Sequence, residues 1–184
     1  MKRIIFLILF LSLIFSKLAF LEEKFIPQVL IPYSEKAPTV DGIIEDKEWE
    51  KAAVVTGFIG ATGQYGGVIV PEIGFNTFAY LMHNNENLFI GIIYKNLEKK
   101  PSKNYRKRDD PVYLDNPQVE LWLTPPAEGN LKGYQMIVNG YNAIFDAEHI
   151  PSLGVEKTAW NGNWTVKSSY KDKKWMVEIA VPFE

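Results

Sequence analysis

The segment from residue 106 to residue 125, RKRDDPVYLDNPQVELWLTP, places charged, aromatic and turn-forming residues in front of a strand-like run. In VELWL the apolar residues alternate, so Glu120 and Trp122 share one face and the aliphatic residues share the other. A carboxylate beside an indole on an outer sheet face suits a polar ligand with a flat side. These residue types allow three kinds of chemistry: a sugar site, a catalytic carboxylate pair or a metal site.

A catalytic pair would have to come from the acidic residues Asp109, Asp110, Asp115 and Glu120. Glycoside hydrolysis needs two carboxyl groups across the bond that breaks, and one of them must have a raised pKa. Three of these four residues fall in a polar loop, where desolvation is not expected. The sequence therefore disfavours a hydrolase, and we expect no enzyme activity and no catalytic residue.

The same loop offers Asp109, Asp110 and Asp115 as calcium ligands, because calcium binds several oxygen atoms from a short segment. The alternative is a loop without an ion, in which these carboxylates pair with the basic residues at 106–108. The chain has no cysteine, which excludes zinc–cysteine sites and disulfides. The pattern predicts a structural calcium site, with the ion-free loop left open.

Haem is not expected. Met82 and His83 are adjacent and could each ligate iron, but successive strand residues point to opposite faces of a sheet. The two side chains therefore cannot both bind one iron from the same strand.

The elements that must position these residues are predicted to be strands. NTFAYLMH alternates, NNEN forms a turn and LFIGIIYKN returns, which is typical of a hairpin. Further strands are predicted at QVELWLTP, GYQMIVNG, NAIFDAEH, WTVKSSY and KWMVEIAVPF, and only IEDKEWEKA has a helical pattern, one or two turns long. We expect an all-β chain, an antiparallel β-sandwich of immunoglobulin-like or jelly-roll-like architecture with one short N-terminal helix and with Trp164 and Trp175 in its core.

The N-terminus has the pattern of a secretory signal. Lys2 and Arg3 precede an apolar run from Ile4 to Phe15, which is too short to span a bilayer comfortably. We expect a signal peptide over 1–20, an extended lead-in over 21–36 and one domain over 37–184. The expected location is secreted, periplasmic or cell-surface, with membrane contact only through an uncleaved signal segment.

The composition of the chain indicates which classes of binding partner are expected. The chain has 184 residues, which suits one domain, and a formal net charge of −2, which gives no field that would gather nucleic acid. Aromatic residues make up 14% of the chain, and we expect some of them to be buried between sheets and others to contact a ligand.

Several motifs resemble those of family 9 carbohydrate-binding modules, a DOMON-like group of β-sandwich domains, and they occur in the same order over residues 37–184. They are APTVDGIIEDKEWEKA, NTFAYLMHNNENLFIGIIYKN, DDPVYLDNPQVELWLTP, GYQMIVNGYNAIFDA and WMVEIAVPF. The resemblance implies a sandwich that binds sugars without catalysis, between two aromatic planes and a polar rim, with structural calcium nearby.

Carried onto this chain, the resemblance makes Tyr113 the first aromatic plane, Glu120 the strand carboxylate, and Gln135 and Asn139 the polar pair. Trp122 shares the face of Glu120, and Trp160 in AWNGNWT could replace the second plane. The chain departs from the family pattern at Ile137, where sugar binders can place an arginine. It also ends at residue 184, before the last strands of that pattern, so we expect a truncated domain.

Two functions follow from this reasoning. The first is an exported module that binds mono- or oligosaccharides, including chain ends, in a protein that also carries a catalytic domain or belongs to a complex. The second is a structural or interaction β-sandwich that has lost sugar binding, as Ile137 and the early end of the pattern indicate. A haem-binding domain and a glycoside hydrolase are less expected.

Overall fold

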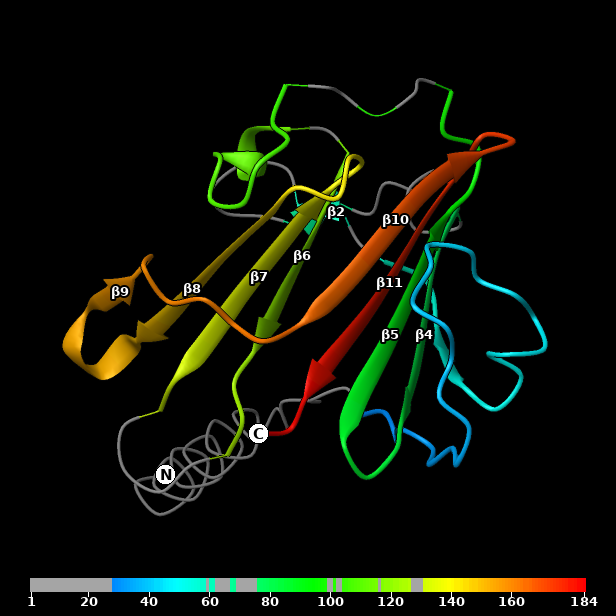
Figure 1. Cartoon of the computed structure of the whole chain (residues 1–184), viewed down its shortest axis with the longest axis horizontal. Coiled ribbons are helices and arrows are strands. Elements are labelled where there is room, and N and C mark those ends of the chain that lie inside the picture. The colour runs from blue at the N-terminus through cyan, green and yellow to red at the C-terminus, as the bar shows by residue number, and fades with distance from the viewer. Residues whose placement is uncertain are drawn as a thin grey trace, which may run out of the picture.

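The computed structural model describes residues 28–58, 76–98, 101, 104–115, 117–126 and 131–184, and the backbone of residues 60–61 and 67–68. Regular structure in these ranges is mainly β, with two single 3₁₀ turns, and includes two antiparallel sheets of five and four strands (Figure 1). The prediction of an all-β chain is confirmed, and the arrangement is consistent with a β-sandwich. The predicted signal peptide lies outside the described residues. No helix in the described part of the chain is long and apolar enough to cross a membrane.

The larger sheet has the strand order β1-β4-β5-β11-β10. Its strands are β1 (Ala53–Val55), β4 (Thr77–His83), β5 (Asn87–Tyr94), β10 (Thr165–Lys171) and β11 (Lys174–Pro182). The predicted hairpin is β4–β5, and its turn is closed by Asn84, whose Oδ1 accepts hydrogen bonds from the backbone N–H groups of Glu86 and Asn87, both at 2.8 Å. The β10–β11 turn uses Asp172 and Lys173 at positive φ, which suits the right-handed twist of a two-residue hairpin.

The smaller sheet has the order β6-β7-β8-β9. Its strands are β6 (Gln118–Leu123), β7 (Gly133–Asn139), β8 (Ile144–Ile150) and β9 (Val155–Lys157); the 3₁₀ turns are η1 (Val112–Leu114) and η2 (Pro151–Leu153), and the short strands β2 (Gly60–Ala61) and β3 (Gly67–Val68) pair with each other. Every strand that the sequence predicted is present, and the short β1, β2, β3 and β9 are additions.

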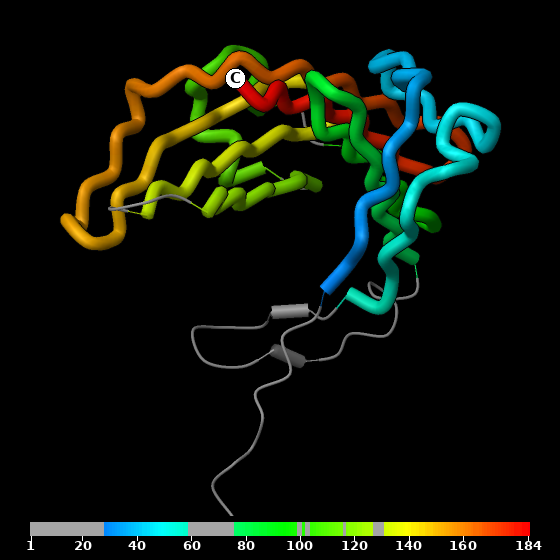
Figure 2. The backbone as a smooth tube through the Cα atoms, turned by 90° about the horizontal axis from the view of Figure 1, so that it is seen from below, coloured from blue at the N-terminus to red at the C-terminus, as the bar shows by residue number. Residues whose placement is uncertain are grey.

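The main core lies between the two sheets. Met136 and Val138 of β7 belong to one cluster with Trp175, Val177 and Ile179 of β11, and all five are nearly inaccessible to solvent. Trp164 belongs to the same cluster and is also buried, so the prediction that Trp164 and Trp175 are core residues is confirmed. Viewed from below, the strands of the two sheets form separate layers (Figure 2). The outer face of the smaller sheet is thereby left to solvent and to the 104–115 loop.

The predicted N-terminal helix is not confirmed. Residues 46–51 form turns, held by backbone bonds from Glu48 and Trp49 to the carbonyl of Glu45, and the described chain has no helix of seven residues or more. The helical spacing in this segment instead directs Ile44 and Trp49 onto the outer face of the larger sheet, against Met82 and neighbouring side chains. A stretch this short has too few helical bonds to offset the cost of nucleation, so packing decides its conformation.

A buried carboxylate explains the Val-Asp-Gly turn in front of that segment. Glu178 of β11 is completely buried, and its Oε2 accepts hydrogen bonds from the backbone N–H groups of Asp41 (3.0 Å) and Gly42 (2.8 Å). Its Oε1 accepts a bond from the indole N–H of Trp49 (3.0 Å). Gly42 has φ +91° and lies so close to Ser168 that a Cβ would be 3.1 Å from its carbonyl carbon, so only glycine fits this turn without strain.

Residues 32–34 of the lead-in run beside the end of β4. Tyr33 forms a parallel bridge with His83, Ser34 N donates to His83 O at 2.8 Å, and His83 N donates to Pro32 O at 3.0 Å. Met82 is buried under Trp49, whereas His83 contacts the rings of Tyr33 and Phe183. These two adjacent side chains therefore point to opposite faces of the sheet.

Candidate functional site

The candidate site lies on the outer face of the smaller sheet. The strand register pairs Trp122 with Gln135 and Glu120 with Ile137, which places all four side chains on one face of β6 and β7. His149 of β8 pairs with Gly133 and lies on the same face. The structure thus brings together three of the predicted ligand residues and adds a histidine. We call Glu120, Trp122, Gln135 and His149 the outer-face cluster.

The cluster is joined by a chain of hydrogen bonds. Glu120 Oε1 accepts bonds from the Trp122 indole N–H (2.7 Å) and from Gln135 Nε2 (2.5 Å). Gln135 Oε1 lies 3.1 Å from His149 Nε2 and accepts a hydrogen bond from it in the tautomer that carries a proton on Nε2. Glu120 Oε2 has no hydrogen-bond partner among the described residues and can accept one from a ligand hydroxyl.

The indole of Trp122 is half exposed and fixed in place. Its exposed fraction is 52%, although its N–H bond to Glu120 and its contact with His149 both restrain the ring. The Trp122 and His149 ring centroids lie 4.7 Å apart, at an interplanar angle of 46°. Because His149 contacts one side of the indole, the exposed area can stack on a ligand without first losing side-chain freedom.

Tyr113 lies on the same face, farther along the strands. Its ring is 49% exposed and contacts Phe145 of β8 edge-to-face, with centroids 5.6 Å apart. Phe145 is four residues before His149, a distance of about 13 Å along the strand. Tyr113 and Trp122 thus mark the two ends of a strip that has Glu120 and Gln135 along it. The distance between the Tyr113 and Trp122 rings along the strands could not be predicted from the sequence, because strand periodicity does not show that η1 lies over β8.

Ile137 is not open to a ligand. It is completely buried with Val112 and Ala143, beneath the 104–115 loop. The position at which the resembling family can place an arginine is therefore part of a small apolar core in this chain.

Asn139 is buried as well and uses its whole amide in the fold. Its Nδ2 donates to Tyr105 O (2.9 Å) and Asp115 Oδ2 (2.7 Å), and its Oδ1 accepts from the backbone N–H groups of Tyr141 (2.9 Å) and Ala143 (3.0 Å). Period-two alternation correctly puts Asn139 on the face of Gln135. The 104–115 loop covers this end of the face, so Asn139 has no free hydrogen-bonding group for a sugar.

Trp160 lies on the other side of the sheet from the outer-face cluster. Its ring centroid is 4.9 Å from that of Tyr134, which neighbours Gln135 on β7 and therefore points to the opposite, inner face. Trp160 cannot supply a second aromatic plane facing Trp122.

The acidic loop does not gather its carboxylates around one point. Asp110 Oδ2 accepts hydrogen bonds from the backbone N–H groups of Lys107 (2.9 Å) and Arg106 (3.0 Å), and these bonds lower the pKa of Asp110. Asp115 is bound by Asn139 and Asn104, while Asp109 is held by its backbone bond to Ile144 O. Among the residues that the structure describes, no group of three or more His, Cys, Asp or Glu side chains could hold a metal ion. Calcium in this loop stays a prediction that carbonyl oxygens would have to complete.

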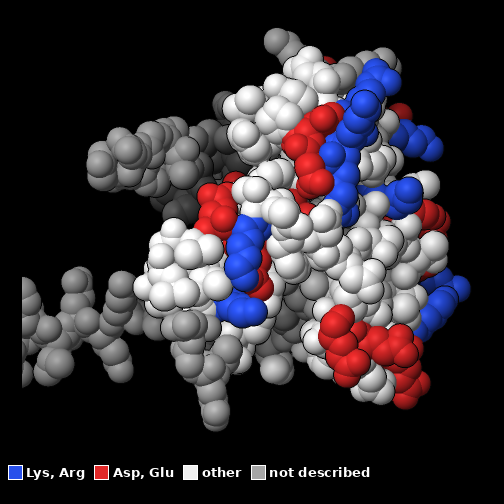
Figure 3. Space-filling model, turned by 60° about the vertical axis from the view of Figure 1, so that its left-hand side comes forward, with Lys and Arg blue, Asp and Glu red and all other residues white. Residues whose placement is uncertain are grey.

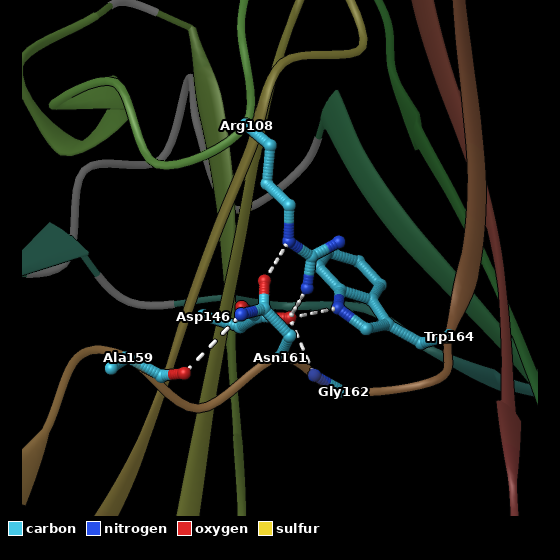
Figure 4. Close-up of polar contacts among 6 residues, drawn as sticks. All are labelled: Arg108, Asp146, Ala159, Asn161, Gly162 and Trp164. Carbon is cyan, nitrogen blue, oxygen red and sulfur yellow. Dashed lines mark hydrogen bonds and ion pairs between the residues drawn. The ribbon is translucent and has the colours of Figure 1, made fainter.

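Arg108 pairs with a residue outside the loop. Asp146 of β8 is completely buried, and its Oδ2 accepts bonds from Arg108 Nη2 (2.5 Å), Gly162 N (3.0 Å) and Trp164 Nε1 (2.7 Å) (Figure 4). Arg108 Nε also donates to Asn161. Asp146 therefore ties the 104–115 loop to the linker between β9 and β10. The alternation in NAIFDAEH indicates an inward position for Asp146 but does not reveal its partners.

Charges of both signs are interspersed on the surface. On the face drawn in Figure 3, Lys and Arg side chains lie beside Asp and Glu side chains rather than in one basic field. Lys132 and Lys157 both bind Glu148, at 3.2 and 2.6 Å, and their hydrogen bonds, that of Lys157 above all, lower the pKa of Glu148. This arrangement offers no large positive patch on that face.

No protein-family model, curated protein or solved structure matches this chain. The resemblance to family 9 carbohydrate-binding modules therefore stays a prediction from motifs. What the structure supports is an all-β architecture of two antiparallel sheets.

Proposed function

We propose that this chain is an exported, non-catalytic carbohydrate-binding domain, and that its sugar site is the outer-face cluster. The observation that carries the proposal is the half-exposed Trp122 indole, held by Glu120 next to hydrogen-bonding groups on Gln135 and His149. A sugar ring has a C–H face that packs on an aromatic plane and a rim of hydroxyls that need donors and acceptors. The cluster offers both kinds of contact on one surface.

The strip between Trp122 and Tyr113 favours oligosaccharides over single sugars. The two exposed aromatic rings lie near opposite ends of a stretch of about 13 Å along β8, which is too long for one sugar ring to contact both. Trp122 would stack on one sugar unit of the oligosaccharide, and Tyr113 would add contact area for a sugar unit farther along it. Tyr113 therefore contributes to oligosaccharide binding and not to monosaccharide binding.

Binding is expected to be weak. The face is open, only one aromatic plane is tied down, and the buried Ile137 removes the charge-assisted donor that an arginine would provide. We expect dissociation constants on the order of a millimolar, about 4 kcal/mol. The cluster has one free carboxylate oxygen, and none of the described residues holds a second carboxylate across from it, so the proposed role is recognition rather than hydrolysis.

Calorimetric titration with mono- and oligosaccharides tests the proposal. Trp122→Ala should abolish binding, Glu120→Gln should weaken it by loss of charge-assisted bonds, and Tyr113→Ala should weaken only oligosaccharide binding. Trp160→Ala is the matched control, since it removes an indole from the other side of the sheet and should leave sugar binding unchanged. If the parent chain binds no sugar at millimolar concentration, the alternative of a structural or interaction domain replaces this proposal.

A further inference from the structure

A cleft of about 540 Å³ opens between the two sheets, on the side of β6 and β7 opposite the outer-face cluster. It lies where β6 and β11 end and β7 begins. Leu123 and Tyr134 contribute to one wall and Leu88 and Val181 to the other, while Trp160 and Trp164 come from the linker between β9 and β10. This volume falls within the range of small-molecule sites, about 300–1,000 Å³.

The aromatic wall of the cleft is built into the sequence AWNGNW. Gly162 lies close to both indoles. A Cβ on this residue would lie 2.6 Å from Cη2 of Trp160 and 3.1 Å from Cδ1 of Trp164. Any larger residue at this position would displace the Trp160 ring. The glycine therefore allows both indoles to line one wall.

The buried Asp146 holds that wall in place. It accepts hydrogen bonds from the Trp164 indole at 2.7 Å and from the backbone of Gly162 at 3.0 Å, and Arg108 holds it from the far side (Figure 4). A linker without regular structure is thus fixed by a carboxylate that solvent does not reach. A wall fixed in this way is preformed, which lowers the entropic cost of binding a ligand.

The lining selects the chemistry of the ligand. Apart from the exposed Glu184, every described side chain that lines the cleft is uncharged, and most are aromatic or aliphatic. Trp160 and Tyr134 present two tilted rings, with centroids 4.9 Å apart, and Trp160 Nε1 donates no hydrogen bond to any described residue. Flat aromatic ligands stack on such planes, and an acceptor atom on the ligand would satisfy the indole N–H.

We infer that this cleft is a second binding site, for a flat, uncharged aromatic compound, independent of the sugar site on the outer face. Trp160 supplies the stacking plane and the indole donor, Tyr134 the flanking ring, and Asp146 the support for the wall.

Titration of the full chain with N-phenyl-1-naphthylamine, an uncharged aromatic probe whose emission rises in apolar surroundings, tests the inference. We expect saturable binding of one probe per chain, displacement by 1-naphthol, and at least tenfold weaker binding in Trp160→Ala. Trp122→Ala is the matched control on the outer face and should bind the probe as the parent does. Gly162→Ala should also weaken binding, because its methyl group pushes the Trp160 ring aside.

Circular dichroism checks that each variant is folded. If Trp160→Ala does not fold, Leu123→Trp, which fills the cleft, is used in its place. Non-saturable emission, or equal probe binding by the parent and by the folded cleft variant, would overturn the site. Displacement by laurate as effective as by 1-naphthol would overturn the assignment to a flat ring, since an acyl chain would then fit equally well.

Discussion

Removing the Asp146 carboxylate is expected to cost about 3–4 kcal/mol of unfolding free energy. In Asp146→Ala the buried Trp164 indole N–H and the Gly162 N–H lose their acceptor, at about 2 and 1 kcal/mol. Arg108 is 34% exposed and can turn to water, so its lost ion pair adds at most about 1 kcal/mol. Such a loss is a large part of the stability of a typical domain, roughly 5–15 kcal/mol.

Urea denaturation of three variants measures this cost. Arg108→Ala leaves the completely buried Asp146 carboxylate without a cation, so it should also be costly, by about 3–5 kcal/mol, although two donors remain. Asp146→Asn removes the buried charge and keeps one oxygen for those donors, so it should cost less than either of the other two variants. If Asp146→Ala is as stable as the parent chain, the carboxylate does not support the linker and the reasoning is refuted.

The remaining predictions concern the second buried carboxylate, the acidic loop and the N-terminus. Burial raises the pKa of Glu178 more than its hydrogen bonds from Gly42, Trp49 and Asp41 lower it, so the folded state holds this proton more tightly than the unfolded state does. Its contribution to stability should be full below its unfolded pKa of about 4.5 and fall as pH rises through the folded value. In Glu178→Gln that fall should disappear, and the variant should be less stable at neutral pH by about 1–3 kcal/mol because one oxygen cannot accept all three donors; a parallel pH dependence in parent and variant would contradict the assignment. If calcium binds the loop of Asp109, Asp110 and Asp115, calcium at about 100 times its dissociation constant should add about 2.7 kcal/mol, measured as a higher melting temperature than in chelator; identical melts would remove the ion. Secreted protein should begin near Phe20 or Leu21, and N-terminal sequencing that finds Met1 would count against export.

The sequence predicts the strands well where local pattern and local turns agree. The hairpin over 77–94 is specified by alternation on both sides of NNEN. The inward position of Trp175 follows from the period of β11, and Trp164, which directly precedes β10, continues the inward alternation of that strand. By contrast, Val155–Lys157 is exposed at every position and has no apolar pattern, so β9 could not be predicted. The segment around Trp49 has helical spacing, but its conformation depends on Glu178, 129 residues away in the chain.

The candidate site could be predicted only in part for the same reason. The alternation in VELWL places Glu120 and Trp122 together, and the register of β6, β7 and β8 then adds Gln135 and His149. Period-two alternation also puts Asn139 on that face, but it cannot tell that the 104–115 loop closes over it. Which face a linker residue such as Trp160 reaches depends on contacts made after the sheets form.

The most direct test of the sugar-site proposal is the indole N–H resonance of Trp122 during titration with an oligosaccharide. Each of the five tryptophans contributes one indole N–H signal to a ¹⁵N–¹H spectrum, and the signal that is lost in Trp122→Phe is the one that belongs to the outer-face cluster. We predict that this signal and the side-chain amide signals of Gln135 shift progressively up to millimolar sugar, while those of the buried Trp164 and Trp175 stay in place. Unchanged spectra at millimolar sugar, or shifts confined to the Trp160 signal, would contradict a sugar site on the outer face.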